Sequence, residues 1–278
     1  MPDLSWLSRT TLLVGSGGVK QLNNAHVLVV GLGGVGSFAA EFIARAGIGE
    51  MTIVDGDVVD PTNRNRQLPA LATNHGMSKA EWMKERLLAI NPELILHVRY
   101  DFLTPDKAEE ICQAAKYDYV MDCIDSVTPK LYLIASAKKC GLNIVSSMGA
   151  GGKMDPTRIK VADLYDTYTD HFALQIRKRL KKKGIRRGLI TVFSDEPAVK
   201  ESLMMTDGSN FKKSAYGTIS YIPAAFGGVC ASVVIRGLLG QKIELHKNKS
   251  LEEMKKKRTS FKVKKDSVEH GGDTLIDE

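Results

Sequence analysis

The first half of the chain alternates short apolar runs with segments of helical periodicity. Five runs have the length and composition of strands, and they cover residues 26–30, 51–54, 94–100, 117–121 and 143–147. The first reads as a buried parallel strand, whereas 94–100 alternates. Two of the segments between them carry helix-start signals, a Ser-x-x-Glu capping box at Ser78 and a Thr-Pro pair at Thr104. Strands that alternate with helices in this way predict an α/β fold, with a doubly wound, Rossmann-like and mostly parallel sheet.

The pattern changes after the glycine-rich segment 149–152. Residues 158–164 alternate in the manner of an antiparallel strand. The other elements expected here are a helix over 170–183, a strand over 189–193, a polar loop over 202–216 and a long apolar helix over 222–239, broken at Gly227 and Gly228. We therefore expect an antiparallel C-terminal extension of the parallel sheet.

The first apolar run leads into a glycine-rich turn. Gly31, Gly33 and Gly36 give the spacing G-x-G-x-x-G, and Gly34 lies inside the same turn. In such a unit one glycine permits the tight turn, the next lets the backbone approach a phosphate, and the third lets the helix pack on the strand. Asp55 follows the second strand, nineteen residues after Gly36, where a carboxylate can bond a ribose hydroxyl. The sequence therefore predicts a nucleotide-binding site.

Polar residues suited to a triphosphate follow this turn. In chain order they are Asp57, Asn63, Arg66, Gln67, Lys79 and Asp125. All except the lysine fall in loops after predicted strands, the side of an open α/β sheet at which ligands bind. Arginine and lysine neutralise phosphate oxygens, and a carboxylate such as that of Asp125 suits Mg²⁺. A hydride-transferring enzyme does not need such a phosphate clamp, so the pattern favours ATP over a nicotinamide cofactor.

The amino-acid composition limits the possible domain size and cellular location of the protein. The 278 residues, of which 43% are hydrophobic, suffice for one large α/β domain or a domain with a smaller lobe. No uninterrupted apolar stretch reaches the roughly 18–20 residues of a membrane span, and the N-terminus lacks the pattern of a secretory signal. The four cysteines form no C-x-x-C pair, which argues against a disulfide framework or a structural zinc site. A cytoplasmic protein without membrane association is expected.

The positive net charge comes from one segment. Residues 177–187 carry eight basic side chains and no acid, so without them the net charge of +7 becomes −1. The basic residues are Arg177, Lys178, Arg179, Lys181, Lys182, Lys183, Arg186 and Arg187. Such a cluster can bind the phosphate backbone of a nucleic acid. The alternative interpretation of this segment, taken in isolation, is a solvated helix end.

The ordered set of motifs resembles the ubiquitin-activating-type (ThiF/MoeB-like) adenylation family. The motifs are GLGGVGS, D-x-D, N-x-x-R-Q, a lysine twelve residues on, and D-C-x-D, within roughly residues 7–150. Bacterial members of this family activate the C-terminus of sulfur-carrier proteins. The resemblance implies binding of ATP and Mg²⁺, adenylation of a carboxylate, and a homodimer.

The resemblance also assigns roles to single residues. The implied cofactor-binding set is Arg9, Gly31, Gly33, Gly34, Gly36, Asp55, Asp57, Asn63, Arg66, Gln67 and Lys79. Within this set, Gly33 and Asp55 are expected to contact the adenine and the ribose. Asn63, Arg66 and Lys79 are expected to contact the phosphates. Catalysis is assigned to Arg66, Lys79 and Asp125, and the metal to Asp125. Arg9 matches an arginine that in this family reaches across the dimer to the ATP phosphates.

Two departures point to one branch of the family. The chain has neither the two zinc-binding C-x-x-C pairs of carrier-activating members nor an evident cysteine nucleophile, because Cys230 lies in an apolar helix pattern. It resembles instead the tRNA threonylcarbamoyladenosine dehydratases, which cyclise a carboxylate-bearing nucleoside beside the anticodon. This resemblance is seen in the segments MDCIDSVTPK, GAGGKMDPTRIKVADL and GTISYIPAAFG, and it covers residues 9–240. The nucleoside supplies its own nucleophile, so the enzyme needs none.

On this resemblance the chain divides into three parts. Residues 1–150 are the nucleotide-binding adenylation half, 151–240 the C-terminal half of the same domain with a basic tRNA-binding insertion, and 241–278 a peripheral Lys-rich tail. The expected partners are a tRNA substrate and a second copy of the chain. Adenylation of a sulfur-carrier protein, an NAD-dependent oxidoreductase and a non-catalytic RNA-binding dimer remain alternatives. A sulfur-relay or carrier partner and an additional alkali-metal ion near the strand ends also stay open.

Overall fold

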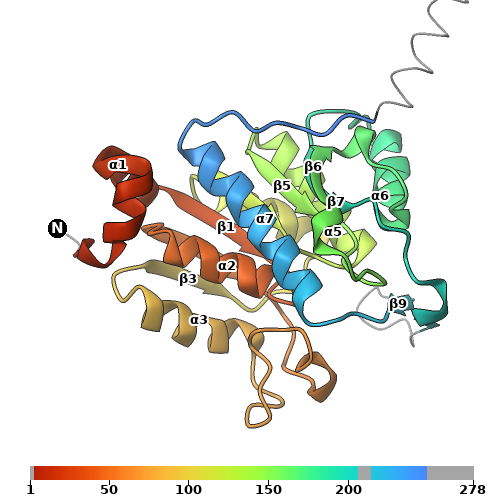
Figure 1. Ribbon diagram of the computed structural model, residues 1–278, viewed down its shortest axis with the longest axis horizontal. Coiled ribbons are helices and arrows are strands. Elements are labelled where there is room, and N and C mark those ends of the chain that lie inside the picture. The colour runs from red at the N-terminus through yellow and green to blue at the C-terminus, as the bar shows by residue number, and fades with distance from the viewer. Residues whose placement is uncertain (1–2, 206–213, 249–278) are drawn as a thin grey trace, which may run out of the picture.

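One seven-stranded sheet forms the centre of the molecule (Figure 1). The structure, a computed structural model, describes residues 3–205 and 214–248. The strands are β1 (His26–Val30), β2 (Glu50–Val54), β3 (Ile95–Arg99), β4 (Tyr119–Asp122), β5 (Ile144–Ser147), β6 (Ile159–Asp163) and β7 (Ile190–Ser194). Their order is β3-β2-β1-β4-β5-β7-β6, and all neighbours run parallel except β6 and β7. The predicted fold class, including the antiparallel extension, is confirmed.

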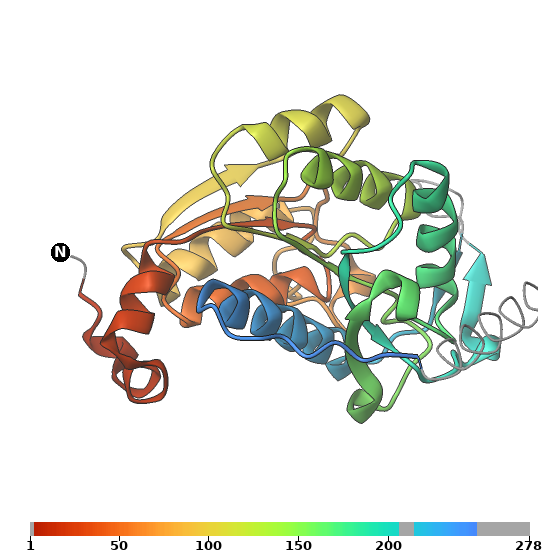
Figure 2. The ribbon, with the colours of Figure 1, turned by 90° about the horizontal axis from the view of Figure 1, so that it is seen from above.

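Helices cover both faces of the sheet, as a doubly wound connection requires. They are α1 (Ser8–Asn23), α2 (Gly36–Arg45), α3 (Lys79–Ile90), α4 (Pro105–Gln113), α5 (Val127–Lys139), α6 (His171–Lys182) and α7 (Tyr221–Leu238). Figure 2 shows α2 and α7 on one face and α4 and α5 on the other. Both predicted N-caps form, since the hydroxyls of Ser78 and Thr104 accept hydrogen bonds from the amides of Glu81 and Lys107. The reciprocal half of the capping box is replaced, because the Glu81 carboxylate accepts from Lys84 and Tyr100.

Two expectations for the C-terminal half were wrong. Helix α7 runs without a break through Gly227 and Gly228. A β-carbon on Gly227 would lie 2.6 Å from the carbonyl oxygen of Val35, so this glycine lets α7 pack closely on α2. The segment expected as a polar loop contains a hairpin of β8 (Leu203–Met205) and β9 (Ser214–Tyr216), and its residues 206–213 lie outside the described residues.

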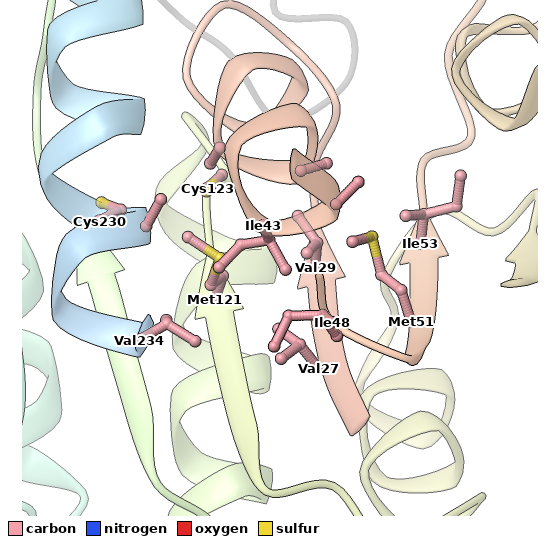
Figure 3. Packing of buried hydrophobic residues seen from close by; sticks show 14 of the residues in the cluster. Val27, Val29, Ile43, Ile48, Met51, Ile53, Met121, Cys123, Cys230 and Val234 are labelled. Carbon is pink, nitrogen blue, oxygen red and sulfur yellow. The ribbon is translucent and has the colours of Figure 1, made fainter. Parts of the chain in front are cut away.

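Close packing of α2 and α7 against the sheet forms one half of the core. Figure 3 shows Ile43 of α2 and Val234 of α7 pointing toward Val29 and Met121 of the central strands. By length and composition α7 also passes the test for a membrane-spanning helix, alone among the helices of the described segments. Its apolar character is explained by its contacts with α2 and the strands, because Phe226, Val233 and Val234 are fully buried there.

The chain returns to the sheet after α7. The amide of His246 donates to the carbonyl oxygen of Val161 at 2.7 Å, which places residues 241–248 beside β6. The rest of the expected Lys-rich tail, residues 249–278, lies outside the described residues. The boundary expected near residue 150 falls between β5 and β6, two strands of the same sheet.

Candidate active site

The glycine turn brings two loops together at the carboxyl edge of the sheet. Gly31 has φ +89°, and a β-carbon there would lie 3.0 Å from the carbonyl oxygen of Cys123. A β-carbon on Gly36 would lie 1.7 Å from the carbonyl oxygen of Gly31, so α2 can start against the turn only with glycine at this position. At Gly33 the nearest atom would be 3.8 Å away. The backbone there is left open beside the N-terminus of α2, an arrangement that suits an anion.

Asp55 joins the loop after β2 to the glycine turn. Its Oδ2 accepts from the amide of Leu32 at 2.6 Å, and its Oδ1 accepts from the amide of Asp57 at 2.8 Å. Burial raises the pKa of Asp55, and this exceeds the opposing effects of Lys79 and the two backbone bonds. The carboxylate is therefore held rigidly where the two loops meet.

The side chain of Lys79 is deeply buried. Only 5% of the residue is exposed, and its Nζ lies 3.0 Å from Oδ2 of Asp57. Its amide also donates to the carbonyl oxygen of Asp57, at 3.1 Å. Both contacts follow from the position of Lys79 as the first residue of α3. The amine is thus fixed beside the loop that carries Asp55 and Asp57.

The N-x-x-R-Q segment is ordered by its own polar contacts. Oδ1 of Asn63 accepts from the amide of Asp60 at 3.2 Å, and Arg66 Nη1 donates to the carbonyl oxygen of Thr62 at 3.0 Å. Oε1 of Gln67 is buried and has no hydrogen-bond partner among the described residues. Nε2 of the same side chain would lie 3.8 Å from a β-carbon placed on Gly33. A polar ligand bound next to Gly33 could donate a hydrogen bond to this unpaired amide oxygen.

Behind the exposed Asp125 lies a buried ion pair that the sequence reading did not assign. Lys130 Nζ lies 2.7 Å from Asp122 Oδ2, both side chains are 0% exposed, and the hydroxyl of Ser146 donates to the same oxygen at 2.6 Å. Asp122 also accepts from the amide of Ile124 at 3.2 Å. This network fixes the loop between β4 and α5. The lysine eight residues after Asp122 was the only available signal, because nothing in the sequence brings Ser146 to it.

A second pair of buried polar residues was also missed. Lys153 and Asp170 are 4% and 6% exposed, and the Nζ of Lys153 donates to the carbonyl oxygen of Glu196 at 2.8 Å. Asp170 caps α6 through the amide of Ala173 at 2.9 Å, while its Oδ2 has no hydrogen-bond partner within residues 3–205 and 214–248. Burial lowers the pKa of Lys153 and raises that of Asp170. Both residues lie near the glycine-rich segment after β5, on the same edge as the glycine turn.

The buried cysteines are not poised for nucleophilic chemistry. Cys230 projects from α7 into the core, and Cys123 follows β4 (Figure 3). Burial raises the pKa of Cys230 to about 12 and that of Cys123 well above its ordinary value. Burial also raises the pKa of Cys112 to about 12. A thiolate is the reactive form, so these three thiols are inert at neutral pH.

Arg9 lies far from the glycine turn of its own chain. It is exposed on α1, which Figure 1 shows projecting at one end of the sheet. Leu7, just before α1, packs on Gly47, which places this segment at the amino edge of β2. The other residues predicted to bind the nucleotide lie at the carboxyl edge, so Arg9 does not join them within one chain.

The basic run is divided between internal contacts and the surface. Arg177 Nη1 donates to the carbonyl oxygen of Thr167 at 2.7 Å, and Arg187 forms a bidentate pair with Asp166 at 2.9 and 3.0 Å. The other six are exposed, namely Lys178, Arg179, Lys181, Lys182, Lys183 and Arg186. They gather at the C-terminal end of α6 and the turn that leads into β7, at the amino edge of the sheet.

The sequence model of the ThiF family matches residues 7–270. The tRNA threonylcarbamoyladenosine dehydratase of Bacillus subtilis is 37% identical over 243 residues, with 85% of this chain and 95% of that protein covered. The Escherichia coli protein of the same name is 39% identical over 258 residues, with 85% and 96% covered. A crystal structure of the E. coli enzyme in complex with ATP superposes with a TM-score of 0.78, at 39% identity, over 86% of this chain and 97% of that one.

These similarities extend over nearly the whole of each relative and confirm the resemblance read from the motifs. The glycine turn, the buried lysine and the exposed aspartate after β4 meet at one edge of a fold that the E. coli enzyme shares. The chain therefore belongs to the ThiF family.

Proposed function

We propose that this protein is an ATP-dependent tRNA threonylcarbamoyladenosine dehydratase. The observation that carries the proposal is the convergence of the open glycine turn, the Lys79–Asp57 pair and Asp125 at one sheet edge. It stands in a chain 39% identical to an E. coli enzyme of that name whose structure contains ATP. A tRNA substrate also agrees with the cytoplasmic location expected from the sequence.

The proposed reaction has two steps. The nucleoside carboxylate attacks the α-phosphorus of ATP and displaces pyrophosphate, which gives an acyl adenylate. The neighbouring ureido group then attacks the acyl carbon, loses its proton and expels AMP, so the net loss from the nucleoside is one water. Ring closure within one nucleoside has the high effective molarity of a positioned reactant, and no covalent enzyme intermediate is needed.

The site residues would stabilise the charge that develops on the phosphates. The open backbone at Gly33 and the N-terminus of α2 face an anion, and Lys79 holds a positive charge at the neighbouring loop. We propose that Arg66 and Asn63 complete the phosphate contacts and that Asp55 bonds the ribose. Asp125 is an exposed carboxylate in the loop after β4, whose residue Cys123 lies against Gly31, and this position fits a ligand of Mg²⁺. Bound magnesium would neutralise the phosphate oxygens.

Arg9 fits this proposal only as part of a homodimer. Its helix α1 exposes Leu12 and Leu13, which are 84% and 85% accessible in the single chain. A second copy that covers these leucines would bring Arg9 of one chain toward the other's site. Mixing Arg9→Ala with Lys79→Ala tests this, because randomly formed mixed dimers would restore roughly a quarter of wild-type activity. Two inactive proteins that stay inactive after mixing would contradict it.

The exposed basic residues support a tRNA substrate. They lie about one helix length, ~18 Å, from the N-terminus of α6 at the nucleotide edge, a separation that a folded RNA can span. Replacing Lys181, Lys182 and Lys183 by Ala should weaken tRNA binding and reduce the slope of log affinity against log salt by about 2–3. Lys139→Ala is the control, since this exposed lysine is paired with Glu109. An unchanged slope would mean that the basic residues form a solvated helix end and do not bind tRNA.

Mass spectrometry of nucleosides tests the activity itself. The full chain with Mg-ATP and tRNA bearing threonylcarbamoyladenosine should release AMP and convert the nucleoside to the product lighter by one water. Lys79→Ala should lower the rate by about 10²–10³-fold, and so should Asp125→Ala. Lys84→Ala is the matched control, because Lys84 lies on the same helix and its pair with Glu81 is solvent-exposed. Wild-type rates in Lys79→Ala would remove the clamp from the mechanism.

The alternatives make different predictions. A carrier-activating enzyme would exchange pyrophosphate into ATP in response to a carrier protein that ends in Gly-Gly. An oxidoreductase would bind NAD in preference to ATP in a titration, and a non-catalytic RNA-binding dimer would bind tRNA without forming AMP. The absent C-x-x-C pairs and the inert buried thiols argue against the first, and the phosphate clamp argues against the second.

A further inference from the structure

Two histidines and a glutamate meet on one face of the sheet at the edge opposite the nucleotide. His26 and Glu50 are the first residues of β1 and β2 and lie side by side in the register. Thr52 pairs with His97 of β3. Side chains two residues apart on a strand point to the same face, so Glu50 and Thr52 lie on one face of the sheet. Their partners in the neighbouring strands, His26 and His97, lie on that face too. Three adjacent strands thus contribute to one cluster.

The ligand atoms have a spacing suited to one ion. Nδ1 of His26 lies 3.4 Å and Nε2 of His97 lies 2.8 Å from the same Glu50 oxygen, and all three atoms fall within 4.8 Å of one another. In a tetrahedral zinc site, with bonds of about 2.0–2.1 Å, neighbouring ligand atoms are about 3.3 Å apart. The His97–Glu50 separation must open by about half an ångström. The two imidazole nitrogens, which lie within 4.8 Å of each other, must reach the same spacing, and the exposed His97 is able to move.

The surroundings of His26 favour a metal over a simple ion pair. A second hydrogen bond, from Nε2 of His26 to the Thr52 hydroxyl at 2.8 Å, would leave the Nδ1 lone pair directed toward Glu50. A neutral imidazole is the form that binds a metal.

We propose that His26, Glu50 and His97 bind one divalent transition-metal ion of the zinc class, with water as the fourth ligand. The ion would tie the edge strand β3 to the central strand β1. Its role would be structural, because the cluster lies at the amino edge of the strands and the glycine turn at the carboxyl edge. In the described residues, no other group of three such side chains has this spacing.

The test is metal binding by the untagged full chain. Elemental analysis after incubation with zinc and gel filtration should find one zinc ion per chain. Cobalt should give the visible absorption of a tetrahedral site. A hundredfold excess of zinc over Kd should raise Tm by about 5 °C or more. Glu50→Gln and His97→Gln should each lose the bound ion and the Tm shift, and both side chains are exposed enough for the fold to tolerate the change.

His171→Gln is the control, since His171 is exposed and outside the cluster. It should bind zinc as the wild type does. A zinc content that is unchanged in Glu50→Gln and His97→Gln would overturn the proposal, and so would a wild-type chain that retains no zinc after gel filtration. Loss of zinc in His171→Gln to the same extent would also overturn it, because binding would then not be specific to the cluster.

Discussion

Removing Lys130 should destabilise the protein strongly. Lys130 and Asp122 form an ion pair with both side chains 0% exposed, at 2.7 Å, and Ser146 donates to the same carboxylate oxygen. In Lys130→Met the apolar stem is kept and the charge is lost. Asp122 is then left buried with only the Ser146 hydroxyl and the Ile124 amide as donors. An uncompensated buried charge is the dominant consequence.

The expected loss is about 3–5 kcal/mol of the free energy of unfolding. For a chain of this size, this corresponds to a decrease in Tm of about 6–20 °C. Lys139→Met is the matched control on the same helix, because its pair with Glu109 is solvent-exposed and is expected to contribute little to stability.

Urea unfolding followed by circular dichroism measures both variants, and the double variant Lys130→Met/Asp122→Leu completes the comparison. Replacing both charges by apolar groups should recover most of the loss, since no charge is then left unpaired. If Lys130→Met lost no more stability than Lys139→Met, the conclusion that the pair is fully buried would be refuted. A double variant as unstable as the single one would show that packing, and not charge, sets the loss.

The remaining predictions concern packing, pH and thiol reactivity. Gly227→Ala should cost about 1–3 kcal/mol in urea unfolding, because its β-carbon would lie 2.6 Å from the carbonyl oxygen of Val35, just before α2. Gly228→Ala, with its nearest atom at 3.6 Å, should be tolerated. Burial raises the pKa of Asp195, but bonds from Arg158, Lys160 and Tyr168 outweigh this and lower it to about 2. The stability it contributes is therefore complete above pH 4 and lost toward pH 2, so Asp195→Asn should lower Tm at pH 7 but not near pH 2. Iodoacetamide at pH 8 should leave Cys230 unmodified in the native protein, and Cys230→Ala should still form AMP; rapid native labelling would contradict the burial of that thiol.

The succession of strands and helices along the chain can be predicted from the sequence. Apolar runs such as His26–Val30 are buried at every position, so their length and composition suffice to identify them. The glycine spacing likewise required a tight turn, because only glycine fits at Gly31 and Gly36. Family membership followed from the ordered motifs. These features are local, and neighbouring residues in the chain specify them.

Contacts between distant segments were decided only by the tertiary structure. Gly227 was read as a helix break because glycine disfavours helices, whereas packing on α2 requires it there. The burial of Lys79 and of the Lys130–Asp122 pair depends on strands and loops far apart in sequence. The cluster of His26, Glu50 and His97 exists only because β1, β2 and β3 lie side by side in one register. The periodicity of apolar residues predicts which face of a strand or helix a side chain lies on. The order and register of the strands decide which other side chains it contacts.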